Sequence, residues 1–356
     1  MFSLLNKSVS STLGKLSLRR LSNVITCMIL ARTTLFLLVS RRKCCSPSVL
    51  SFFLDNHFLT STESTLLCSI HPTAIVHPDA LIGQDVSIGP FCTVGPNVKL
   101  GNGCQLYAGS HIFGDTELGD RCTVMTGAVV GEDLPGSTTI GCNNLIGHHA
   151  VVGARCQDLK YKLGDECFLH VGDSNDIREF TSVHRSSKSS DRTVIGNNNL
   201  VMGSCHIAHD CKVGNNNIFA NGTIFAGHVV VEDFAHTAGA IVVHQFCHIG
   251  SYAFLGGGSV VALDVPKYMM VSGDRAQLRG LNLEGLRRNG FSSEEAYRKI
   301  FMPGDGSNGG IKDRLSQVEQ DEELATSEVV TSMVQSIRDS FKENRRGICK
   351  SRYCHD

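Results

Sequence analysis

One hydrophobic residue recurs at every sixth position along most of the chain. Steps of six from Ile70 to Val130 meet an aliphatic side chain every time, and the spacing resumes at Ile140 and runs, with interruptions, to Val261. Only Thr237 is not apolar. An α-helix repeats every 3.6 residues and an ordinary strand every two, so neither explains this period. The pattern instead predicts short strands joined by tight turns.

The residue two positions before each aliphatic is usually small, and glycine often follows the aliphatic. Compact side chains at fixed intervals are what the corners of a narrow prism require. Seven cysteines fall on this small position, and we interpret them as small buried hydrophobic residues rather than nucleophiles: they are Cys92, Cys104, Cys122, Cys156, Cys205, Cys211 and Cys247. No CxxC pair occurs and the spacings match no zinc template, so we expect neither a metal nor a cofactor.

The period resembles the hexapeptide repeat of left-handed parallel β-helix proteins. This resemblance implies a mainly β fold with three faces per coil and about 18 residues per turn, over residues 69–263. The pattern breaks at 132–139, 157–170 and 184–194. We expect these segments to be loops that leave the prism, where functional residues concentrate.

The first 68 residues are predicted to be an organellar transit peptide. The first acidic residue is Asp55, and the stretch before it carries eight Lys/Arg and ten Ser, a composition typical of transit peptides. An apolar run at 24–39 contains Arg32 and is shorter than the roughly 20 residues that span a bilayer. We therefore expect import into the mitochondrion, with the plastid as the alternative, and no stable membrane insertion.

From residue 264 to 356 the period of six is absent, which predicts a C-terminal helical domain. The segment 291–301 opens with Ser292 and has Glu295 three residues later, a capping box. A glycine-rich linker at 303–310 precedes a stretch, 312–346, that reads as one or two amphipathic helices. The whole chain has a formal net charge of −1, which provides no general field for a polyanion, so nucleic acid is not an expected partner.

Histidines are concentrated in the last predicted coils. Residues 18 apart should lie on neighbouring coils about 4.8 Å apart, so His209 stacks on Gly227, and Asp210 on His228. A histidine can take a proton from an attacking hydroxyl, a carboxylate can fix its tautomer, and the Gly227 N–H can stabilise an oxyanion. No GxSxG motif occurs, which favours direct acyl transfer from a thioester over an acyl-enzyme.

Several longer motifs resemble one enzyme family, the UDP-N-acetylglucosamine O-acyltransferases that begin lipid A synthesis. The resemblance covers about residues 69–302, and its motifs are QDLKY (157–161), AHDC (208–211), FAGHV (225–229), VHQFCHIG (243–250), DVPKY (264–268) and NLEGLRRNGFS (282–292). It implies transfer of an (R)-3-hydroxyacyl group from acyl carrier protein to the 3-hydroxyl of UDP-N-acetylglucosamine. It also implies a homotrimer with sites between subunits.

The resemblance further implies a role for individual residues. His209 would be the general base, Asp210 its partner and Gly227 the oxyanion donor, while Gly257 would limit acyl-chain length. The expected substrate contacts are Asp158, Lys160, His206, His228, His244, Gln245, Asn282, Glu284 and Arg288. Two departures stand out: about 20 extra residues between Val130 and QDLKY, enough for an additional coil, and Arg275 where the family pattern has histidine.

Three other functions fit parts of the sequence. A γ-type carbonic anhydrase shares the fold and holds zinc with three histidines, but its HxxxxH spacing is absent; the nearest pairs are His206 with His209 and His244 with His248. Another hexapeptide acyltransferase of the same pathway would lack the NLEGLRR context. A catalytically inactive scaffold fits poorly with an intact His209 and Asp210.

Overall fold

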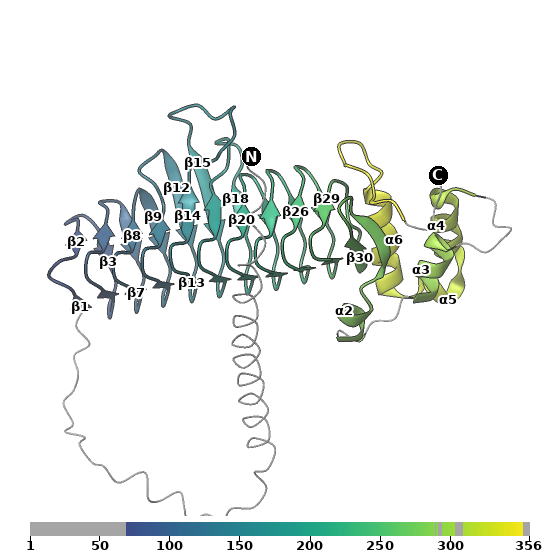
Figure 1. Ribbon diagram of the computed structural model, residues 1–356, viewed down its shortest axis with the longest axis horizontal. Coiled ribbons are helices and arrows are strands. Elements are labelled where there is room, and N and C mark those ends of the chain that lie inside the picture. The colour runs from purple at the N-terminus through teal and green to yellow at the C-terminus, as the bar shows by residue number, and fades with distance from the viewer. Residues whose placement is uncertain (1–68, 289, 291–293, 303–308, 352–356) are drawn as a thin grey trace, which may run out of the picture. The chain divides into compact units, whose positions relative to one another are not determined.

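The computed structural model describes residues 69–288, 290, 294–302 and 309–351. The predicted transit peptide, 1–68, and the predicted helix cap at Ser292 lie outside the described residues. Within the described ranges the chain winds into a three-sided parallel β-solenoid followed by short helices (Figure 1). No helix in those ranges is long and apolar enough to cross a membrane.

Each face of the solenoid is one sheet, because each strand pairs in parallel with the strand three places later in the chain. The end of sheet A, at β30 and β31, departs from this order. Sheet A contains β1 (Ser69–Ile70), β4 (Ser87–Ile88), β7 (Gln105–Leu106), β10 (Thr123–Val124), β13 (Leu145–Ile146), β16 (Asp176–Ile177), β19 (Leu200–Val201), β22 (Ile218–Phe219), β25 (His236–Thr237), β28 (Phe254–Leu255), β30 (Met269–Ser272) and β31 (Gln277–Leu281). Sheet B contains β2 (Ile75–Val76), β5 (Thr93–Val94), β8 (His111–Ile112), β11 (Val129–Val130), β14 (Val151–Ala154), β17 (Ser182–His184), β20 (His206–Ile207), β23 (Ile224–Phe225), β26 (Val242–Val243) and β29 (Val260–Val261). Sheet C contains β3 (Leu81–Ile82), β6 (Val98–Leu100), β9 (Asp115–Leu118), β12 (Gly136–Ile140), β15 (Cys167–Val171), β18 (Thr193–Ile195), β21 (Lys212–Val213), β24 (Val230–Val231) and β27 (His248–Ile249).

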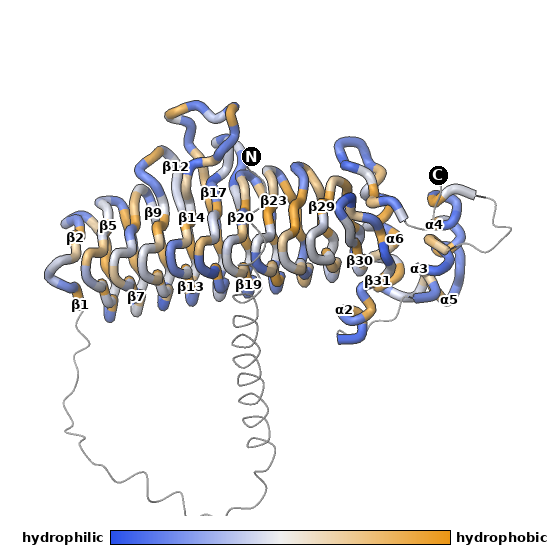
Figure 2. Tube along the Cα trace, viewed as in Figure 1, coloured by the Kyte–Doolittle hydropathy of each residue, from blue (hydrophilic) through white to orange (hydrophobic). Residues whose placement is uncertain are grey.

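From Ile88 onward, the aliphatic residues of the six-residue period are buried and form the core, as predicted. Ile88, Val94 and Ile112 are at most 1% exposed, and apolar and polar residues alternate along the coils (Figure 2). Thr237 is also buried, and its hydroxyl forms a hydrogen bond with the Thr223 hydroxyl at 2.7 Å. All seven of these cysteines are buried and free. Six lie at corners of the prism, but Cys156 lies in the segment between β14 and β15, so its predicted place in the repeat was wrong. Burial raises the pKa of the Cys211 and Cys247 thiols to about 12, so these thiols stay protonated and unreactive.

Register follows the predicted 18 residues in the early coils and again in the late coils up to β29, but not in the middle or at the end, where Phe254 pairs with Met270. His206 pairs with Ile224, and Val230 with His248. In the middle of the solenoid Leu145 pairs instead with Asp176, because the chain between them makes an excursion.

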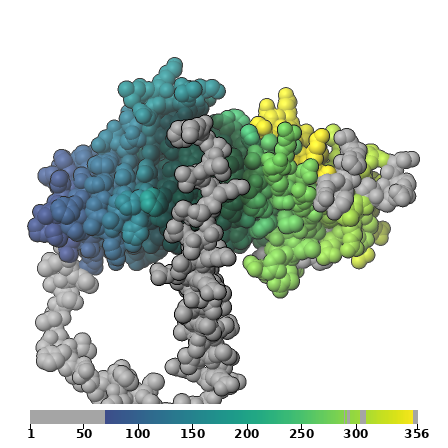
Figure 3. Space-filling view, in the orientation of Figure 1, coloured from purple at the N-terminus to yellow at the C-terminus, as the bar shows by residue number. Residues whose placement is uncertain are grey.

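The predicted loops are shorter than the breaks in the period. Strands β12, β15 and β18 occupy parts of 132–139, 157–170 and 184–194, so the prediction that these segments are wholly loop was wrong. The hexad pattern predicts only the ends of these strands. Sheet C has longer strands in these coils, and the first residues of these strands lie outside the period. The segment that does leave the prism lies between β14 and β15, and it stands out from the solenoid surface (Figure 3).

Arg185 holds this irregular region together. It is 1% exposed, and its guanidinium donates to the carbonyls of Glu132 and Leu134, each at 3.3 Å, and to the Thr138 hydroxyl at 3.0 Å. Desolvation lowers the pKa of Arg185. The three acceptors compensate in part for burying the charge.

After residue 264 the chain first extends sheet A and only then becomes helical. β30 pairs in parallel with β28, and β31 pairs with β30 in antiparallel fashion. The helices that follow are α2 (Leu283–Arg288), α3 (Glu294–Phe301), α4 (Ile311–Gln320), α5 (Glu322–Ala325) and α6 (Glu328–Asp339). The stretch predicted to form one or two helices therefore forms three. Contacts such as Lys267 Nζ to Ser332 Oγ, at 3.2 Å, join α6 to the last coil.

Candidate active site

The predicted catalytic residues meet at the corner between sheets B and C, which we call the B/C corner. His209 and Asp210 lie between β20 and β21, and Gly227 and His228 occupy the same turn one coil later, between β23 and β24. The His228 N–H donates to the His209 carbonyl at 3.0 Å. The stacking that was predicted from the 18-residue period is thus present.

Asp210 and His209 form a buried hydrogen-bonded pair. His209 Nδ1 lies 2.7 Å from Asp210 Oδ2, and the two residues are 5% and 2% exposed. Burial alone would raise the pKa of the Asp210 carboxyl, but hydrogen bonds from His209 and Ser187 outweigh it and hold this pKa below its usual range. An ionised carboxylate only accepts hydrogen bonds, so His209 carries a proton on Nδ1. In the neutral imidazole this leaves the lone pair on Nε2.

Gly227 packs directly against the imidazole. A Cβ added to Gly227 would lie 2.4 Å from His209 Cε1 and 2.5 Å from Nε2, closer than atoms can approach. The glycine is therefore required by this contact, since its φ is not in the left-handed region. The Gly227 N–H donates no hydrogen bond to another described residue.

His228 completes the cluster from the next coil. Its Nε2 lies 3.6 Å from Asp210 Oδ2, its ring meets that of His209 edge to face at 5.2 Å, and it stacks on Phe246 at 4.6 Å. Desolvation lowers the pKa of His228. The ligand atoms of His209, Asp210 and His228 all lie within 4.8 Å of one another, close enough to share a divalent ion, so any functional assignment has to be tested against metal binding.

A second histidine pair, His184 and His206, lies on sheet B next to the B/C corner. His206 Nδ1 is 2.8 Å from Ser182 Oγ, and its ring centroid is 5.1 Å from that of His184. Desolvation and the neighbouring His184 lower the pKa of His206 to about 4. His206 is therefore a neutral hydrogen-bonding group at physiological pH.

The projecting segment after β14 brings Asp158 to the B/C corner. Asp158 Oδ2 lies 3.9 Å from His209 Nε2, on the side of the ring opposite Asp210. Asp158 Oδ1 accepts the Lys160 backbone N–H at 2.8 Å, while Lys160 itself is exposed. Asp158 is therefore placed where a group bound to His209 would meet it.

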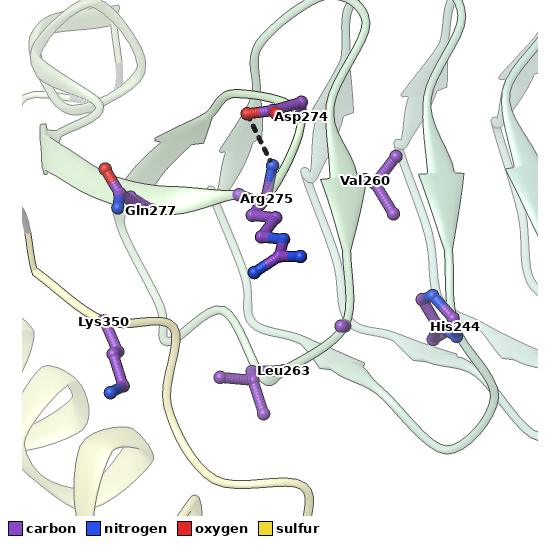
Figure 4. Close-up of a pocket in the computed structure, with 9 residues that line it drawn as sticks. His244, Val260, Leu263, Asp274, Arg275, Gln277 and Lys350 are labelled. Carbon is purple, nitrogen blue, oxygen red and sulfur yellow. Dashed lines mark hydrogen bonds between the residues drawn. The ribbon is translucent and has the colours of Figure 1, made fainter.

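His244 and Gln245 continue the B/C corner by one more coil, and both are exposed. His244 borders a cavity of about 620 Å³ that is also lined by Arg275, on the turn between β30 and β31, and by Lys350 (Figure 4). Two cationic side chains and a histidine suit a phosphate group.

The remaining predicted residues lie away from the B/C corner, at another corner or on α2. Gly257 is between β28 and β29, on the A/B corner, where an added Cβ would meet the Gly239 carbonyl at an ordinary 3.6 Å. Asn282 donates to the carbonyl of Tyr252 on the C/A corner at 2.9 Å and caps α2 through Gly285 N. Glu284 and Arg288 are paired on α2 at 2.8 Å.

Three contacts to the catalytic pair and its neighbours were not predicted. Ser187 donates to Asp210, Thr193 Oγ1 accepts the Asp210 N–H at 2.9 Å, and Ser182 bonds His206. Ser187 and Asp210 are 23 residues apart, and Ser182 and His206 are 24 apart. A constant spacing of 18 residues therefore connects neither pair.

Comparison with known proteins gives a consistent result. The family model described as "Udp N-acetylglucosamine O-acyltransferase; Domain 2" matches residues 264–349, and bacterial transferase hexapeptide repeats match 192–227. A GMPPB C-terminal domain model matches 70–162.

The relatives agree over a longer span. An Arabidopsis thaliana protein named as a probable mitochondrial acyl-[acyl-carrier-protein]–UDP-N-acetylglucosamine O-acyltransferase is 65% identical, over 89% of this chain and 97% of its own length. The structure of an Arabidopsis UDP-N-acetylglucosamine acyltransferase superposes with a TM-score of 0.78 at 69% identity, covering 79% of this chain and all of that one. The Bacteroides fragilis enzyme superposes with a TM-score of 0.65 at 35% identity, covering 79% of this chain and all of its own. The predicted left-handed parallel β-helix is confirmed.

Proposed function

Because the chain belongs to the acyl-[acyl-carrier-protein]–UDP-N-acetylglucosamine O-acyltransferase family, we propose that it transfers an (R)-3-hydroxyacyl group from acyl carrier protein to the 3-hydroxyl of UDP-N-acetylglucosamine. The observation that carries the mechanism is the 2.7 Å contact between His209 Nδ1 and the ionised Asp210. This contact leaves Nε2 of His209 as a base next to a glycine N–H that has no partner among the described residues.

The chemistry needs no covalent enzyme intermediate. His209 Nε2 takes the proton of the sugar hydroxyl as its oxygen bonds to the thioester carbonyl carbon. The carbonyl oxygen becomes an oxyanion, to which the Gly227 N–H donates. Collapse of this intermediate breaks the carbon–sulfur bond, and the imidazolium returns the proton to the departing thiolate of the carrier protein.

Assembly as a homotrimer would bring the separated residues into one site. His209, Gly257 and Asn282 lie on three different corners of one prism, so a single chain cannot surround one substrate with all of them. In a three-fold assembly a corner of one subunit faces a different corner of its neighbour. Analytical ultracentrifugation should therefore give three times the chain mass, and a monomer that is fully active would contradict this arrangement.

We place the enzyme in the mitochondrion, with residues 1–68 removed as a transit peptide. The acid-free, Arg/Ser-rich start and the mitochondrial name of the Arabidopsis relative support this. A fluorescent protein fused behind residues 1–68 should enter mitochondria; fluorescence in plastids would support the alternative, and cytosolic or secretory fluorescence would contradict import.

The reaction is tested with purified protein, UDP-N-acetylglucosamine and a set of hydroxyacyl carrier proteins, with acyl-UDP-N-acetylglucosamine detected by mass. A parallel series with chelator and with added zinc addresses the His209, Asp210 and His228 cluster. Activity that is unchanged by chelation supports general-base catalysis. Acyl transfer that needs the metal would contradict this mechanism, and hydration of CO₂ without acyl transfer would favour the carbonic-anhydrase alternative.

A further inference from the structure

Asp210 has two histidines within reach and must be directed to one of them. Its Oδ2 lies 2.7 Å from His209 Nδ1 and 3.6 Å from His228 Nε2. A small rotation of the carboxylate would bring it closer to His228 and lengthen its contact with His209. In that event His209 would lose the partner that fixes its tautomer, so something must hold the carboxylate in place.

Ser187 makes three contacts with this carboxylate. Its hydroxyl lies 2.6 Å from Asp210 Oδ2, and its N–H lies 3.1 Å from Oδ1 and 3.2 Å from Oδ2. Ser187 is 4% exposed, so water does not compete for these bonds. Ser187 thus bonds both oxygens of the Asp210 carboxylate, and this geometry resists rotation of the carboxylate.

The backbone that carries Ser187 is itself fixed. Ser186 N donates to the Phe168 carbonyl at 3.0 Å, and Phe168 N donates back to Ser186 Oγ at 2.9 Å. One residue earlier, the buried Arg185 is anchored by the carbonyls of Glu132 and Leu134. Ser187 therefore belongs to a rigid segment rather than to a free loop end.

We propose that Ser187 is a positioning residue that aims Asp210 at His209 and away from His228, so that His209 keeps its proton on Nδ1 and its lone pair on Nε2. This inference rests on the acyl transfer proposed above. Ser187 acts through Asp210 and need not touch either substrate.

The test is a double-mutant cycle on acyl transfer by the full trimer. Ser187→Ala should lower kcat about ten-fold with the KM for UDP-N-acetylglucosamine unchanged, because binding groups are not altered. In an Asp210→Ala background the same substitution should change kcat less than two-fold, since there is no carboxylate left to aim. Ser110→Ala is the matched control, because Ser110 is also buried, lies on an early coil and has its hydroxyl against Cys92 rather than Asp210; it should leave kcat within two-fold.

Two results would overturn the assignment. One is a Ser187→Ala enzyme with the parent's kcat. The other is an equal loss in both backgrounds, which would mean that Ser187 only supports the fold. Should the alanine variant not assemble, Ser187→Cys, which is nearly isosteric but a much weaker donor, gives the same comparison. Failure of the parent to transfer the acyl group, or full activity of Asp210→Ala, would instead refute the proposed mechanism.

Discussion

Because Gly227 contacts the His209 imidazole, we predict that Gly227→Ala displaces the ring and lowers kcat. The new Cβ would lie 2.4 Å from His209 Cε1 and 3.0 Å from Nδ1. Ordinary contact begins at 3.4 Å, so the imidazole must move by about 1 Å. The ring cannot move this far and keep its 2.7 Å bond to Asp210.

The size of the loss follows from this displacement. A misplacement of about 1 Å can cost about 10² in rate, and complete loss of a general base costs about 10²–10⁴. We therefore expect kcat to fall by about 10²–10⁴. Alanine is allowed at the backbone conformation of Gly227, whose φ is not left-handed, so the variant should fold and assemble as the parent does.

The assay is steady-state acyl transfer, with size-exclusion chromatography to check assembly. Gly95→Ala is the control, because it adds a Cβ on the same corner in an early coil, at an ordinary 3.4 Å from the Ile112 carbonyl; it should keep kcat within two-fold. A Gly227→Ala enzyme that assembles and retains kcat within a few-fold would refute the close packing of base and glycine.

The other predictions concern Asp210, Gly257 and His206. Asp210→Asn should lower kcat less than loss of His209 does, because it disturbs the tautomer but leaves a base; an equal or larger loss in the same assay would contradict this. Gly257→Met should shift preference toward shorter acyl chains, since a closed groove excludes methylenes that are each worth about 0.8 kcal/mol of burial; an unchanged chain-length profile would place the limit elsewhere. His206 has a folded-state pKa of about 4, below its ordinary value, so the unfolded chain binds more protons as pH falls below that ordinary value. Stability should therefore fall from about pH 6.5 to pH 4, by at most about 1.4 kcal/mol per pH unit. His206→Gln should flatten this dependence of the unfolding midpoint, and an unchanged slope would contradict it.

The repeating part of the molecule could be predicted from the sequence because its period is fixed by geometry. One aliphatic per short strand and three strands per coil determine which residues stack, and this placed His209 beside Gly227 and Asp210 beside His228. The same reasoning identified the corner cysteines as buried and inert. No longer-range information was needed, since each coil contacts only its neighbours.

The rest could not be predicted because it depends on where the period is broken. Ser187 reaches Asp210 across an interruption of the repeat, so no constant spacing connects them. The length of the sheet C strands and the anchoring of Arg185 are likewise set by contacts within the excursions. Gly257 and Asn282 came from family resemblance alone, and in one chain they are on corners remote from His209.

Turnover by purified His209→Ala at fixed pH tests most directly whether His209 is the general base. His209 lies at a corner outside the aliphatic core, so the variant should assemble as the parent does. Its kcat should fall by at least about 10²–10⁴, the usual contribution of a positioned general base. Turnover within a few-fold of the parent would contradict the assignment, and the base would then have to be His228 or His244.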